Sequence, residues 1–163
     1  MNAVEAIKNS LAVSDMIWQS YVDDLSDEDF FKRPAENVNH IAWQLGHLIA
    51  SEHQIIDGVC PGAMPELPEG FARKHSTETA GTDDSAAFLT KSQYVQLAQQ
   101  QRQATLDALA GLSETDLDKP GPEGMEQIAP TVGATFSMQA AHYLMHAGQW
   151  VVLRRTLGKP PLF

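Results

Sequence analysis

Two histidines, His142 and His146, lie four residues apart in the segment MQAAHYLMHAGQWVVLRR. On a helix, side chains at positions i and i+4 project from the same face, with their Cβ atoms about 6 Å apart. Two imidazoles held in this way can share one divalent metal ion. The segment HYLMH has no glutamate between the histidines, so it lacks the general base of an HExxH zinc protease. The pair therefore predicts metal binding without that protease chemistry.

A third histidine, His47, lies in the apolar segment NHIAWQLGHLIASEH and could complete a three-histidine site. Three protein ligands with an open fourth position are the arrangement of catalytic zinc, whereas structural zinc is normally closed by four ligands. Each part has a simpler interpretation as well. The pair could be polar residues on a partly exposed helix face, and a lone histidine among leucines is more often a hydrogen-bonded core residue.

The other histidines fit such a site less well. His40 precedes His47 by seven residues, which is about 10.5 Å of helical rise, so we do not expect both at one ion. His53 is rotated roughly 240° away from His47 around the helix. His75 lies in a long loop. We therefore expect none of these three to be a ligand of the same ion.

Three further residues could take part in chemistry. Glu52 and Asp57 could hydrogen-bond a ligating imidazole or transfer protons. A solvated helix face is the simpler interpretation, and we expect it for both carboxylates. Cys60 is the only cysteine, so no intramolecular disulfide forms, and no histidine can be placed beside it to activate the thiol.

Apolar residues at spacings of three and four predict helices over residues 3–24, 40–58, 85–110 and 133–157. Asn39 is the expected N-cap of the second helix. The connections 60–84 and 111–131 are rich in Pro, Gly and acidic residues, and loops of this length are often functional. No segment alternates between apolar and polar residues as a β-strand does. The sequence thus predicts an all-α four-helix bundle with two long crossover loops, forming one domain over residues 1–163.

The charge balance argues against several classes of partner. The chain has 11 basic and 21 acidic residues, a formal net charge of -10, which repels nucleic-acid backbones and anionic lipid surfaces. No apolar run approaches the roughly 18 residues that span a bilayer. The N-terminal residues lack the pattern of a signal peptide. We expect a soluble cytoplasmic protein that binds neither nucleic acid nor membrane.

Two segments resemble a known family. NHIAWQLGHL resembles the second-helix motif of the DinB/YfiT-like metalloenzymes, where the histidine matching His47 is a metal ligand. TVGATFSMQAAHYLMHAGQWVVLRRTLGKPP resembles the final helix of that family. There, the pair matching His142 and His146 is followed by a Gly-Gln step, here Gly148-Gln149, and by Leu-Arg-Arg and Gly-x-Pro-Pro. LSETDLDKP is similar to the segment before that helix.

The resemblance implies an up-down-down-up bundle, a homodimer, and a nickel or zinc ion near one end of the bundle. The family is similar to bacillithiol S-transferases and mycothiol-dependent maleylpyruvate isomerases. It therefore implies a small-molecule substrate and the use of a low-molecular-weight thiol. Tyr143 stands where many family members have a glutamate, which removes a carboxylate from the surroundings of the ligands.

Three functions remain open at this point. The first is a metal-dependent transferase or isomerase that acts on a small molecule through His47, His142 and His146. The second is a non-catalytic, metal-binding dimeric helical module, whose site would be closed by a fourth ligand such as Glu52 or His53. The third is a bundle whose histidines are incidental, for which imidazoles more than about 8 Å apart would argue, since a Zn–N bond is only about 2.1 Å.

Overall fold

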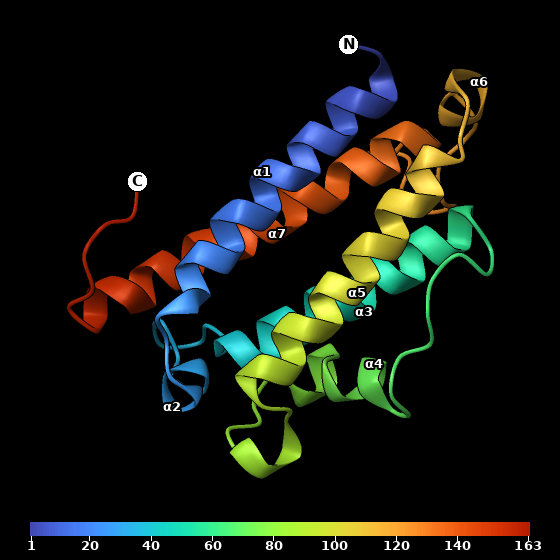
Figure 1. The fold of residues 1–163 in the computed structure, drawn as a ribbon. Coiled ribbons are helices and arrows are strands. Elements are labelled where there is room, and N and C mark those ends of the chain that lie inside the picture. Colours follow the sequence, from blue (N-terminus) through green and yellow to red (C-terminus); the bar gives the residue numbers. More distant parts are fainter.

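A computed structural model describes residues 1–163, and it is helical throughout (Figure 1). Four long helices build the molecule: α1 (Ala3–Asp23), α3 (Ile41–Val59), α5 (Lys91–Ala110) and α7 (Val132–Thr156). Short helices interrupt the connections: α2 (Asp27–Phe30), α4 (Phe71–Lys74) and α6 (Glu114–Leu117), with 3₁₀ turns at Thr77–Thr79 and Ser85–Ala87. The only β-type pairing is an isolated bridge between Pro120 and Thr131. The predicted all-α fold is confirmed.

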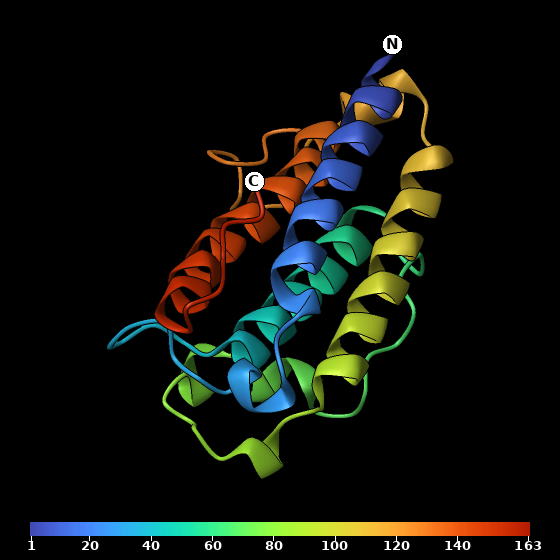
Figure 2. The ribbon, with the colours of Figure 1, turned by 60° about the vertical axis from the view of Figure 1, so that its left-hand side comes forward.

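The directions of the four helices follow from the contacts between them. Hydrogen bonds between residues 14 and 140 and between residues 21 and 154 join α1 to α7. Residue numbers rise in the same direction along both helices, so α1 and α7 are parallel. Contacts 15–102 and 19–99 join α1 to α5 in opposite order. Contacts 44–150 and 47–142 do the same for α3 and α7. The bundle is therefore up-down-down-up, with α1 beside α7 and with α3 and α5 running the other way (Figure 2).

The helix boundaries differ from the predicted ones at two informative places. The third long helix begins at Lys91, not at residue 85, because Thr90 and Gln93 form a capping box there. The N-cap of α3 is His40, so the prediction of Asn39 is wrong. His40 Nδ1 accepts a hydrogen bond from the backbone N–H of Trp43 at 3.1 Å, as an Asn or Ser side chain usually does at this position.

The core is apolar along most of α1, whereas α3 and α5 each bury several polar side chains. The buried side chains of α1 recur at spacings of three and four residues and include Leu11 and Trp18. The inner face of α5 carries Tyr94, Gln101, Arg102 and Thr105 beside small apolar residues. These polar groups need partners inside the bundle, because an unpaired buried polar group costs free energy.

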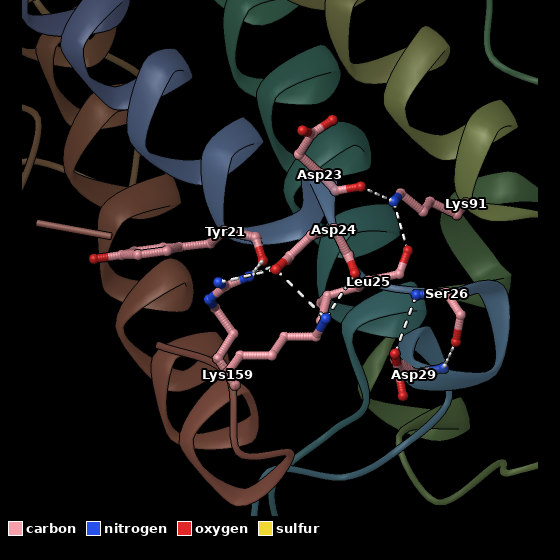
Figure 3. A network of polar contacts seen from close by, with 9 residues as sticks. Tyr21, Asp23, Asp24, Leu25, Ser26, Asp29, Lys91 and Lys159 are labelled. Atoms are coloured by element: carbon pink, nitrogen blue, oxygen red, sulfur yellow. Dashed lines mark hydrogen bonds and ion pairs between the residues drawn. The ribbon is translucent and has the colours of Figure 1, made fainter. Parts of the chain in front are cut away.

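The carboxyl-terminal end of α1 is bound by cations from two other helices (Figure 3). Lys91 Nζ donates to the carbonyls of Asp23 and Leu25, at 2.6 Å each. Arg154 donates to the Tyr21 carbonyl at 3.0 Å and pairs with the Asp24 carboxylate, and Lys159 Nζ donates to the Asp24 carbonyl at 2.7 Å. The last carbonyls of a helix lack intrahelical partners and carry its negative dipole end, so these cations fix α1 to α5 and α7.

The connection after α3 is held down on the bundle. His75 Nε2 accepts a hydrogen bond from the Tyr94 hydroxyl at 2.6 Å, and His75 Nδ1 donates one to the Phe71 carbonyl at 2.8 Å. Gly46 of α3 lies directly beneath this ring, and a Cβ there would stand 2.1 Å from His75 Cδ2. None of the helices is both long and apolar enough to cross a membrane.

Candidate metal centre

Helices α3 and α7 bring three histidines together in the middle of their antiparallel contact. His47 comes from α3, and His142 and His146 come from successive turns of α7. One ring nitrogen from each lies within 4.8 Å of the other two. The ring centroids are separated by 5.2 to 5.6 Å, so the three imidazoles surround one point. This spacing is well inside the 8 Å beyond which incidental histidines were expected.

His146 is oriented by Gln44, three residues before His47 on α3. Gln44 Oε1 lies 3.0 Å from His146 Nδ1 and 2.8 Å from Trp150 Nε1. The indole N–H can only donate, so the Gln44 atom at this position is the amide oxygen, which can only accept. His146 Nδ1 therefore carries the proton, and Nε2 keeps its lone pair for a metal ion.

His47 is supported on two sides. The Trp43 indole stacks on its ring, with centroids 5.3 Å apart and planes inclined by 3°. Trp43 Nε1 in turn donates to Thr79 Oγ1 at 3.2 Å. On the other side lies the backbone of His75, which acts to raise the pKa of His47. The connection between α3 and α5 thus holds the ring of a candidate ligand in place.

All three imidazoles are held in their neutral form. Burial lowers the pKa of His142 and of His146 to about 4, and repulsion between the neighbouring imidazolium charges adds to this effect. Burial also lowers the pKa of His47, against the opposing effect of the His75 backbone. Neutral imidazole is the form that binds metal, so the cluster is ready to bind an ion at neutral pH.

The donor set fits a zinc or nickel ion. Imidazole nitrogen suits both metals. Two nitrogens bound to one tetrahedral zinc lie about 3.4 Å apart, given a Zn–N bond of about 2.1 Å. The nitrogens here would have to approach one another by at most about 1.4 Å, which rotations of the side chains supply.

The remaining histidines have other partners. His40 caps α3 and places Nε2 3.1 Å from the Thr82 carbonyl. His53 Nδ1 lies 3.2 Å from Gln101 Oε1. His75 lies between Tyr94 and Phe71, as described above. The structure thus separates these three rings from the cluster, in agreement with the spacing argument.

The expectation of a solvated Glu52 is wrong. Its side chain is fully buried, 3.0 Å from Arg102 NH1 and 2.7 Å from the Thr105 hydroxyl. Arg102 also binds Asp15 at 3.1 Å. Burial raises the pKa of Glu52, and the charge of Arg102 opposes that rise. The Glu52 carboxylate therefore belongs to an ion network inside the bundle. The other carboxylate considered, Asp57, accepts a hydrogen bond from the Gly62 backbone N–H at 2.9 Å.

Tyr143 belongs to the same interior network. Its ring packs against Trp18, with centroids 5.8 Å apart, and the Arg102 guanidinium lies 4.7 Å from its centre. Although it follows His142 in sequence, its side chain is buried among α1, α3 and α5 and not among the three imidazoles.

Two parts of this arrangement were not found from the sequence. Gln44 and His47 share a helix face through their three-residue spacing, and this signal could have identified Gln44. Arg102 lies in the row of Ala98, Thr105 and Leu109, which would have placed it on the buried side of α5. Neither signal says which side chain from another helix is the partner.

Comparison with known proteins agrees with the fold and with the resemblance of the motifs. The profile of the DinB superfamily matches residues 12–150. A solved structure described as a conserved protein from Enterococcus faecalis superimposes with a TM-score of 0.68 at 17% sequence identity. The superposition covers 98% of this chain and 99% of that one, and it shows a shared fold. No curated protein matches the sequence. From the extent of the profile match, this chain belongs to the DinB superfamily.

Proposed function

We propose that this protein is a metal-dependent enzyme that acts on a small molecule, as an S-transferase or isomerase that uses a low-molecular-weight thiol. His47, His142 and His146 would hold one zinc or nickel ion. The observation that carries the proposal is the convergence of three neutral imidazole nitrogens within 4.8 Å. A divalent cation held there would stabilise the anion of a thiol or of water, and so lower the pKa of that group.

The partners of the neighbouring side chains support an open site over a closed one. A purely structural site would need a fourth protein ligand. Of the two residues considered for that role, Glu52 pairs with Arg102 and Thr105, and His53 lies beside Gln101. Each residue would then have its own role. The imidazoles would bind the ion, and Gln44 and Trp43 would orient the imidazoles. The fourth coordination position would remain open for the substrate.

A thiol titration of the cobalt-loaded protein tests this proposal. Cobalt(II) replaces zinc in histidine sites and gains an absorption band when a thiolate binds it. We expect 2-mercaptoethanol, a weaker acid than a cysteine side chain, to produce that band below pH 8.5, the ordinary pKa of the cysteine thiol. His142→Ala should lose the band. His53→Ala, which changes a histidine of the same helix as His47 outside the cluster, should keep it.

Two results would count against the proposal. If cobalt binds but no thiol changes its spectrum, the thiol-dependent reaction is wrong. If metal removal lowers the melting temperature and no thiol, water or substrate analogue reaches the ion, the non-catalytic helical module is the better account. The homodimer implied by the family resemblance remains a prediction, which light scattering of the purified protein measures.

A further inference from the structure

A hollow of about 770 Å³ begins at His142 and continues between α3 and α7. Ser51 lies one helical turn beyond His47, and Ile55 one turn further, so both line the α3 side. Met138 and Met145 line the α7 side, on the same helix face as His142. The groove therefore runs from the histidine cluster toward the end of α3 and the beginning of α7.

The lining of this groove is apolar and unusually exposed. The connection between α6 and α7 supplies Met125 and Ile128, so three methionines and two isoleucines face the hollow. Met145 and Ile128 remain 59% and 64% exposed, which means that neither is used by the core. No lysine, arginine, aspartate or glutamate lines the hollow. A charged or strongly polar group would find no partner in it apart from two serines and His142.

The size and chemistry of the groove indicate what it binds. Small-molecule sites typically measure about 300–1,000 Å³ and combine an apolar lining with a few precisely placed polar groups. Methionine side chains adapt to ligands of varied shape, because the thioether chain is flexible and polarisable. Here the polar end is His142, one of the three clustered histidines.

We propose that this groove binds the hydrocarbon part of an amphiphilic small-molecule substrate whose polar head reaches the metal site. The proposal rests on the proposed function, because the head group needs the ion. It adds the substrate class: a molecule with an apolar tail, recognised by Met138, Met145, Met125, Ile128 and Ile55. Polar metabolites of similar size would be bound only through their head groups.

A series of straight-chain hydroxamic acids tests the groove separately from the metal. Acetohydroxamate, butanohydroxamate, hexanohydroxamate and octanohydroxamate carry the same metal-binding head and differ only in tail length. Their affinities for the zinc-loaded full-length protein are measured by calorimetry. We expect the affinity to rise about two- to fourfold for each methylene until the groove is filled, as burial of hydrocarbon predicts.

Matched methionine variants locate the tail. Met145→Gln should weaken octanohydroxamate about fivefold to tenfold, by loss of apolar contact, and leave acetohydroxamate unchanged. Met16→Gln makes the same substitution at a methionine of α1 with similar exposure, 53%, outside the groove. It should change neither affinity.

The outcomes separate the two proposals. Equal affinities for all four hydroxamates, with zinc bound, would overturn the groove proposal and leave the metal site standing. Failure of the protein to take up zinc would overturn the proposed function and the groove proposal with it. A dimer that dissociates on Met145→Gln, together with no dependence on tail length, would show that a second copy of the chain covers the groove, and would also overturn the proposal.

Discussion

At the scale of single residues, the candidate metal centre depends on a side chain that is not itself a ligand. Gln44 uses one oxygen to accept hydrogen bonds from both His146 and Trp150. It thereby fixes the tautomer and the ring orientation of His146. Groups that orient metal-bound histidines in this way typically contribute tenfold to hundredfold in metal affinity.

Gln44→Leu should therefore weaken zinc binding by about tenfold to hundredfold while the protein stays helical. Trp150→Phe is the matched control, because it removes the other hydrogen bond to the same oxygen and leaves that of His146. Zinc affinity is measured by competition with a chromophoric chelator. Equal losses of affinity in the two variants would mean that Gln44 acts through packing and not through His146.

The buried ring of His75 makes a separate prediction about pH. Burial lowers its pKa to about 4, from an unfolded value near 6.5. Between these values the unfolded chain binds a proton that the folded chain does not. The stability contributed by the neutral ring is thus fully present above pH 6.5 and is lost as the pH falls toward 4.

Urea unfolding in the presence of a chelator, at pH 6.5 and at pH 5, measures this effect. Wild type should lose more stability over this interval than His75→Leu, although the variant is less stable at both pH values. Burial raises the pKa values of Asp15 and Glu52, which therefore titrate with the opposite sign, but both groups are present in the two proteins and cancel in the comparison. Identical losses would contradict the assignment of a neutral His75.

Among the elements, α3 and the connection that follows it are in close contact at one glycine, Gly46. The His75 ring occupies the space that a Cβ of Gly46 would need. The same connection contacts the His47 ring through its backbone. Tight packing at Gly46 therefore determines how closely this connection approaches the candidate ligand.

Gly46→Ala should destabilise the protein by about 1–3 kcal/mol, the usual cost of overpacking a filled site. The double variant Gly46→Ala/His75→Ala should be more stable than the sum of the single effects predicts, because the second change removes the ring that the methyl group strikes. Both free energies come from urea unfolding. Strictly additive effects would show that the ring and the glycine are not coupled.

At the scale of the whole molecule, one ion network joins all four long helices. Glu52 of α3, Arg102 of α5 and Asp15 of α1 are linked by contacts of 3.0 and 3.1 Å, and Tyr143 of α7 lies against the guanidinium. Arg102 and Glu52 are almost completely buried. Removing one member leaves an unpaired charge in the interior, which is far more costly than removing the pair.

Arg102→Met should therefore destabilise the protein by about 3–5 kcal/mol, or prevent folding. The double variant Arg102→Met/Glu52→Gln should recover part of that loss, because the fully buried Glu52 then carries no unpaired charge, whereas the partly exposed Asp15 still lacks Arg102. Denaturant unfolding of the three proteins at pH 7 measures the coupling. A double variant no more stable than Arg102→Met would contradict this account of the network.

Much of this organisation could be predicted from the sequence, but the burial of Glu52 has a cause outside its own helix. The spacing of Leu11, Trp18 and their neighbours predicts the helices, and the i,i+4 pair of His142 and His146 predicts their shared face. Resemblance to a family supplied the order of the bundle. The burial of Glu52 was missed because it depends on Arg102, a residue fifty positions away, and periodicity within one helix does not say which side chains of two helices meet.

Whether His47, His142 and His146 bind one divalent ion is decided by the metal content of the purified protein. Protein purified without a histidine tag is incubated with zinc or nickel, dialysed, and measured by inductively coupled plasma mass spectrometry beside His142→Ala and the control His53→Ala. We expect about one ion per chain in wild type and His53→Ala, and none in His142→Ala. Wild type without metal, or His142→Ala with as much metal as wild type, would contradict this expectation.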